Sequence, residues 1–136
     1  MITAVDSNVL LDFLNHDPEF GISSRNSLRS CAMEGRLFAC DVVWAEIAGC
    51  FASISTCIDI LREVGIEFSP IESEAAFEAG FAWKAYRKRG GARTRVAADF
   101  LIGAHALLQA DRLLSRDRGF YQSYFKRLSV LDPSTG

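Results

Sequence analysis

The sequence lacks a long hydrophobic segment, and this absence narrows the possible classes of protein. No run of about 18 apolar residues occurs in the 136 residues, so we expect no transmembrane helix. The first residues carry no basic cluster and Asp6 interrupts their apolar run, so we expect no secretory signal. Hydrophobic residues make up 49% and charged residues 24%, which excludes a disordered chain and predicts one domain spanning 1–136.

Cysteine is scarce, and its spacing matches no common metal-binding motif. The four cysteines are Cys31, Cys40, Cys50 and Cys57, and none belongs to a CxxC pair. Four cysteines also allow a zinc site or a disulfide pair, but buried thiols in apolar segments are the interpretation we favour. This cysteine usage is typical of a reducing compartment, so we expect a cytoplasmic protein without membrane contact.

The net charge of −2 conceals a strong asymmetry along the chain. Residues 1–83 contain four basic and thirteen acidic residues, whereas residues 84–136 contain eleven basic and four acidic ones. Such polarity indicates a highly charged partner or substrate, or else two halves that pair with each other on folding.

Short β-type runs alternate with helical patterns along the chain. The strands are expected at residues 2–5, 36–40, 66–71, 112–115 and 128–131. The helices are expected at residues 8–15, 23–33, 42–51, 53–63, 73–89, 95–110 and 120–125. This alternation predicts an α/β fold with a central, mainly parallel sheet flanked by helices on both faces. Ligands of such folds bind at the carboxyl ends of the strands.

Four acidic residues occupy positions that are unusual for solvated surface carboxylates. Asp6 directly follows one predicted strand and Asp117 closely follows another, each at the carboxyl end of its strand. Glu46 has only apolar or small residues three and four positions away, so we expect it on the buried face of its helix. Asp99 lies near a helix start among apolar neighbours. Burying these carboxylates is costly unless basic side chains or cations compensate them.

An acidic cluster without interleaved His or Cys favours a hard divalent cation, Mg²⁺ or Mn²⁺, over zinc. Asn8 and Ser115 are well placed beside the acids to orient a carboxylate or a metal-bound water. Asp12 lies one helical turn after Asn8, either on a solvated face or within reach of the site. Asp41 is interpreted as a helix cap rather than a ligand.

Four motifs together resemble a known family. They are VDSNVLL at residues 5–11, VWAEI at 43–47, ADFLIGAHA at 98–106 and LSRDRGF at 114–120. In order, spacing and total length they are similar to those of PIN-domain ribonucleases, and in particular of the VapC toxins of VapBC toxin–antitoxin modules. The resemblance extends from Thr3 to about Asp132.

The resemblance implies a metal-dependent endoribonuclease that hydrolyses RNA with a metal-activated water, using Mg²⁺ or Mn²⁺. It also implies a VapB-type antitoxin as partner and a homodimer. Asn8 matches the family's small polar residue, and Ser115 stands where Thr is more usual. The family's catalytic, metal-binding acids fall on Asp6, Glu46, Asp99 and Asp117.

Residues 84–95 carry six Lys or Arg and no acid, and further arginines flank Asp117. We interpret this segment as an RNA contact, with an acidic antitoxin tail as the alternative occupant. Tyr86 and Phe120 could stack on bases but are more typical of packing residues, and His105 is expected to form a structural hydrogen bond. The candidate RNA-binding residues are Arg87, Arg89, Arg93, Arg95, Arg116 and Arg118.

Two other functions fit parts of the sequence. A non-catalytic RNA-binding or protein-interaction module could keep the same fold, although the intact acids argue against it. A phosphoacceptor receiver domain also uses Mg²⁺ at strand ends, but it needs paired acids after the first strand and a late lysine. The single Asp6 and the lack of a lysine between Lys88 and Lys126 argue against a receiver.

Overall fold

Five parallel strands form one sheet in the order β3-β2-β1-β4-β5. The structure, a computed structural model, describes residues 1–91 and 97–134. Because β1 is the central strand, Ala4 lies opposite Phe38 on one side and Leu113 on the other. The strands are β1 (Ile2–Val5), β2 (Arg36–Cys40), β3 (Ile66–Ser69), β4 (Arg112–Leu114) and β5 (Val130–Leu131). The predicted parallel α/β fold is therefore confirmed.

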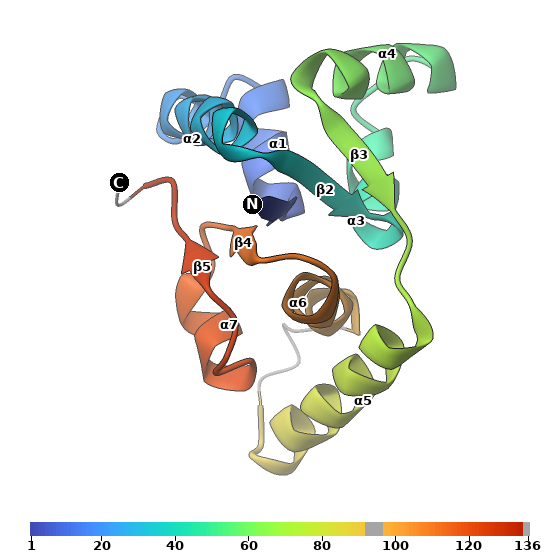
Figure 1. Cartoon of the computed structure of the whole chain (residues 1–136), viewed down its shortest axis with the longest axis vertical. Helices are drawn as coiled ribbons and strands as arrows, with labels where there is room; N and C mark the ends of the chain where they lie inside the picture. Colours follow the sequence, from blue (N-terminus) through green and yellow to red (C-terminus); the bar gives the residue numbers. More distant parts are fainter. Residues whose placement is uncertain (92–96, 135–136) are drawn as a thin grey trace.

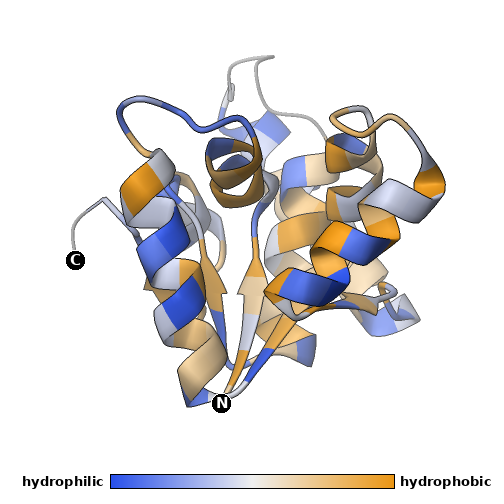
Figure 2. Ribbon diagram, turned by 90° about the horizontal axis from the view of Figure 1, so that it is seen from above, coloured by the Kyte–Doolittle hydropathy of each residue, from blue (hydrophilic) through white to orange (hydrophobic). Residues whose placement is uncertain are grey.

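Helices cover both faces of the sheet. In Figure 1, α1 and α2 lie on one side of the strands, and α5 and α6 lie on the other. Figure 2 shows hydrophobic residues on the strands and along parts of the helices, with hydrophilic residues interspersed on the helices. The helices are α1 (Ser7–Leu14), α2 (Gly21–Glu34), α3 (Asp41–Ala48), α4 (Ile54–Val64), α5 (Ser73–Lys88), α6 (Ala97–Gln109) and α7 (Arg118–Tyr124).

Local capping sets several helix ends. Ser53 caps α4, where its hydroxyl accepts a hydrogen bond from the Thr56 amide at 3.2 Å. Gly65 ends the same helix in the left-handed conformation, with φ of 87°. The prediction that Asp41 caps α3 is wrong by one residue: Cys40 is the N-cap, and Asp41 is the first helical residue, where the helix dipole favours its charge.

The core combines apolar strand residues with a cluster of aromatic rings. Phe100 is fully buried, and its ring lies within 5.2–5.8 Å of the rings of Tyr86, Phe120 and Tyr124. Tyr86 is itself buried, so its ring packs in the protein and does not present a face to a base. The packing interpretation of Tyr86 is confirmed.

The predictions for histidine and cysteine are largely confirmed. His105 is buried, and its Nε2 lies 2.9 Å from the Ser69 hydroxyl, as expected of a structural histidine. All four cysteines are free thiols, but Cys50 is exposed because α3 ends two residues before it. No helix in the described ranges combines the length and apolarity needed to span a bilayer.

Candidate active site

Asp6 is the centre of the candidate site. Its backbone amide bonds to the Leu114 carbonyl at 2.9 Å, which continues the pairing of β1 with β4 one residue past the strand. Its side chain is only 5% exposed yet well bonded. Oδ2 accepts hydrogen bonds from the Ser115 hydroxyl at 2.8 Å and the Tyr121 hydroxyl at 2.9 Å. Oδ1 accepts one from the Ser7 amide at 2.7 Å, at the start of α1.

Asn8 and Ser115 link Asp6 to the loop between β4 and α7. The Asn8 amide nitrogen lies 3.4 Å from both Asp6 Oδ2 and Ser115 Oγ. The Arg116 amide donates to Asn8 Oδ1 at 3.3 Å, and the Asp117 amide donates to Ser115 Oγ at 3.0 Å. Both supporting residues chosen from the sequence therefore contact the Asp6 carboxylate.

Burial and neighbouring charge both disfavour the ionised form of Asp6. Burial raises the pKa of Asp6 from 3.8 to about 6, against the opposing effect of the hydrogen bonds from Ser115, Tyr121 and Ser7. The charge of Glu46 raises the pKa of Asp6 further. The carboxylate thus remains costly to ionise in the absence of a cation.

The charges of the remaining acids affect Tyr121, the hydrogen-bond partner of Asp6. The pKa of the Tyr121 hydroxyl is well above its ordinary value. Burial is the largest cause, and the charge of Asp6 and the hydrogen bond to Asp6 raise the pKa further. The charges of Asp99 and Asp117 raise the Tyr121 pKa as well. The fields of all four predicted acids therefore act on the hydrogen-bonded pair of Asp6 and Tyr121.

The expectation that Glu46 belongs to a buried helix face is wrong. Glu46 is exposed, and the buried residues of α3 are Val43 and Ile47. The reason is that α3 ends at Ala48, so the small and apolar residues after it do not continue a packed helical face. Glu46 lies at the rim of the site, where its charge still reaches Asp6.

Asp99 and Asp117 are half-buried, in the first turn of α6 and immediately before α7. In residues 1–91 and 97–134, no three Asp, Glu, His or Cys side chains already form a group that could hold a metal ion. The donor chemistry nevertheless fits Mg²⁺ or Mn²⁺, because the site offers carboxylate oxygens and because the buried Asp6 carboxylate is costly to ionise without a compensating cation.

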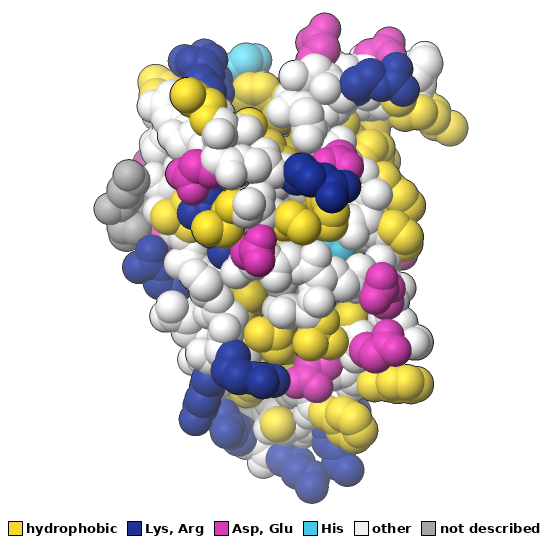
Figure 3. Space-filling model, in the orientation of Figure 1, with side chains coloured by type: hydrophobic (Ala, Val, Ile, Leu, Met, Phe, Trp, Pro, Cys, Tyr) yellow, Lys and Arg dark blue, Asp and Glu magenta, His cyan; other side chains and the backbone are white. Residues whose placement is uncertain are grey.

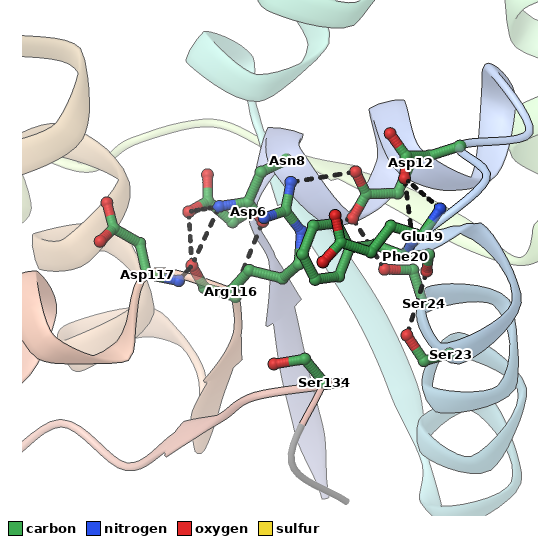
Figure 4. Close-up of polar contacts among 12 residues, drawn as sticks. Asp6, Asn8, Asp12, Glu19, Phe20, Ser23, Ser24, Arg116, Asp117 and Ser134 are labelled. Atoms are coloured by element: carbon green, nitrogen blue, oxygen red, sulfur yellow. Dashed lines mark hydrogen bonds and ion pairs between the residues drawn. The ribbon is translucent and has the colours of Figure 1, made fainter.

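The structure also reveals an ion pair beside the site that sequence reasoning missed. Asp12 is buried, not on a solvated helix face, and it accepts two hydrogen bonds from the Arg116 guanidinium. Figure 4 shows the side chains of Arg116 and Asp117 leaving the loop in opposite directions. The only sequence signal for this contact is the one-turn spacing of Asn8 and Asp12.

The basic residues near the end of α5 are exposed. Figure 3 shows Lys and Arg side chains gathered at the end of the molecule where α5 finishes. Arg87 lies over the Trp83 ring at 4.7 Å, and Arg89 lies over the Tyr124 ring at 5.5 Å. Arg118 is half-buried at the start of α7. Two further predicted RNA-binding residues, Arg93 and Arg95, lie outside the described residues.

The family model of the PIN domain matches residues 3–126. The chain belongs to the PIN domain family. This confirms the family that the four sequence motifs predict. No protein of curated function matches the sequence.

Solved structures share the fold of this PIN domain at low sequence identity. VapBC2 from Rickettsia felis, bound to a DNA fragment from its promoter, is 20% identical with a TM-score of 0.76, and the match covers 97% of this chain and 98% of that one. VapBC-1 from nontypeable Haemophilus influenzae is 19% identical with a TM-score of 0.74, covering 99% and 100%. FitAcB from Neisseria gonorrhoeae is 18% identical with a TM-score of 0.69, covering 100% of both chains. At these identities, the similarity shows the common fold.

Proposed function

We propose that this PIN domain is a metal-dependent endoribonuclease and the toxin of a type II toxin–antitoxin module. The observation that carries the proposal is the buried Asp6 carboxylate at the carboxyl end of the central strand. The charge of Glu46 raises the pKa of Asp6, and the charges of Asp99 and Asp117 raise the pKa of Tyr121, which is hydrogen-bonded to Asp6. Membership of a family whose VapC-type members are generally nucleases supports the same activity.

Asp6, Glu46, Asp99 and Asp117 would hold Mg²⁺ or Mn²⁺. When bound, such an ion supplies an activated water at neutral pH and neutralises the charge that develops on the scissile phosphate. The exposed Glu46 and the half-buried Asp99 and Asp117 can reorient toward Asp6 at lower cost than a fully packed side chain.

The chain's own residues set the orientation of this centre. Ser115 and Tyr121 donate to one Asp6 oxygen and the Ser7 amide donates to the other, so the carboxylate cannot rotate without losing hydrogen bonds. Asn8 holds the loop that carries Asp117 against the same carboxylate. This arrangement preorganises the site for a substrate phosphate.

RNA binding requires positive charge near the acids. Arg87 and Arg89 on the exposed end of α5, and Arg118 beside Asp117, are the described residues that we assign to phosphate contacts. Arg93 and Arg95 complete the basic segment in the sequence.

The structural neighbours support an antitoxin partner for this chain. These neighbours are VapBC and FitAB assemblies, and three of them are bound to DNA. These neighbours support our proposal of a VapB-type antitoxin as partner. We also propose a homodimer as the assembly and the cytoplasm as the location, as the sequence resemblance implies.

The activity is tested by incubating the purified chain with single-stranded RNA in Mg²⁺, in Mn²⁺ and in EDTA. Cleavage should require an ion, and Asp6→Asn and Asp99→Asn should each slow it by about 100-fold or more. Glu63→Gln, an exposed acid on α4, is the matched control and should cleave normally. RNA that is bound but left intact with both ions would instead support a non-catalytic module.

A further inference from the structure

The Arg116 side chain, beside the candidate site, is held by an ion pair with Asp12 and by the ring of Phe20. Its Nε and Nη2 donate to the two oxygens of Asp12 at 2.6 and 3.1 Å, the bidentate geometry of a strong ion pair. Its guanidinium carbon lies 4.0 Å from the centre of the Phe20 ring. Asp12 is further bonded by the Ser24 hydroxyl at 3.0 Å. The Arg116 side chain is 27% exposed and that of Asp12 only 6%.

These contacts join the loop after β4 to α1 and to the start of α2, about one hundred positions earlier in the sequence. Arg116 lies between Ser115, which bonds Asp6, and Asp117, one of the four acids. Its backbone is bonded to Asn8 and its side chain to Asp12, so α1 holds the loop at two points one helical turn apart. The main chain at 115–117 is therefore fixed against the helix that Asp6 caps.

We propose that Arg116, clamped by Asp12, is a positioning residue that fixes Ser115 and Asp117 relative to Asp6, and that it does not bind RNA. The inference rests on the proposed nuclease function. It replaces the RNA contact that the basic character of the segment predicts for Arg116.

The geometry favours positioning over phosphate binding for two reasons. The Asp12 carboxylate already neutralises the guanidinium, so the pair presents little net charge to an RNA backbone. Turning Arg116 outward would also leave the buried Asp12 without its cation, and an unpaired buried carboxylate is strongly unfavourable.

Three variants separate the two roles by steady-state kinetics on RNA. Arg116→Lys keeps the charge but loses the bidentate fork, and it should lower kcat by about 10- to 100-fold with KM changed less than about twofold. Asp12→Asn frees the arginine and should lower kcat in the same way. Arg116→Gln should do likewise, and the Asp12→Asn/Arg116→Gln double variant should lose no more than the worse single variant.

Two matched controls calibrate this comparison. Arg25→Gln, an exposed arginine on α2, should leave both parameters unchanged. Arg87→Gln, on the basic end of α5, should raise KM and reduce its salt dependence without lowering kcat. The proposal is overturned if Arg116→Lys or Asp12→Asn retains normal kcat, if Arg116→Gln behaves like Arg87→Gln, or if the losses in the double variant multiply.

Hydrogen exchange tests whether the Arg116–Asp12 ion pair fixes the loop at residues 115–117, independently of any nuclease activity. Hydrogen exchange of the amides at residues 115–118 should accelerate at least about tenfold in Asp12→Asn and Arg116→Gln, and not in Arg25→Gln. Unchanged exchange in both variants contradicts the clamp. If the native chain cleaves no RNA but the exchange result holds, the proposed function fails and the positioning of the loop stands.

Discussion

Replacing Asp6 by Asn should stabilise the metal-free protein at neutral pH even as it removes activity. The native carboxylate is buried, and burial raises its pKa from 3.8 to about 6. Because the folded pKa is the higher one, the folded state binds more protons than the unfolded state between these two values. The contribution of Asp6 to the free energy of unfolding therefore falls as pH rises through this window.

The shift of about two pKa units corresponds to about 3 kcal/mol. This penalty is absent at pH values below 3.8 and complete above about 6. Asparagine carries no charge, so this penalty is absent in Asp6→Asn. The hydroxyls of Ser115 and Tyr121, which donate to Asp6 in the native protein, must then accept hydrogen bonds from the asparagine amide, and this change costs about 1 kcal/mol. The net gain expected for Asp6→Asn near pH 7.5 is about 2 kcal/mol.

Urea unfolding in EDTA at a series of pH values from 4 to 7.5 measures this effect. The difference in unfolding free energy between Asp6→Asn and the native protein should increase from pH 4 to about pH 6 and then level off. Asp59→Asn, at an exposed position of α4, is the control and should follow the native protein. A difference that stays constant with pH, or that moves against Asp6→Asn as pH rises, would refute the argument from desolvation.

Two further predictions concern ligand and pH effects on stability. A Mg²⁺ concentration one hundred times Kd should stabilise the native protein by about 2.7 kcal/mol in thermal or urea unfolding, whereas Asp6→Asn should gain little; equal gains in both proteins would place the ion elsewhere. Burial lowers the pKa of His105, so the unfolded state takes up the proton first as pH falls, and the contribution of His105 to native stability should decline below about pH 6.5. His105→Gln should lack this decline relative to the native protein, and parallel pH profiles of the two would contradict it.

The sequence alone was sufficient for the order and type of the elements. The bounds of β1 and β2, residues 2–5 and 36–40, agree with the expected strands, and Ser53 and Gly65 delimit α4 as their capping preferences predict. Such features depend on hydrophobic periodicity and on backbone conformations within a few residues. Asp6 and Asp117, with Asn8 and Ser115 beside them, could be chosen from the sequence because strand ends mark the binding edge of a parallel sheet. Glu46 and Asp99 are chosen from their helical neighbours, and the burial expected for Glu46 on that basis is wrong.

Only the tertiary structure decided how these side chains are buried and paired. The bonds from Tyr121 to Asp6 and from Arg116 to Asp12 join residues separated by 115 and 104 positions, and no local pattern specifies either contact. Glu46 is exposed because its helix ends at Ala48, whereas Asp12 is buried because an arginine from the far end of the chain packs on it. Burial and charge compensation depend on which segments meet in space, and that is a property of the folded chain.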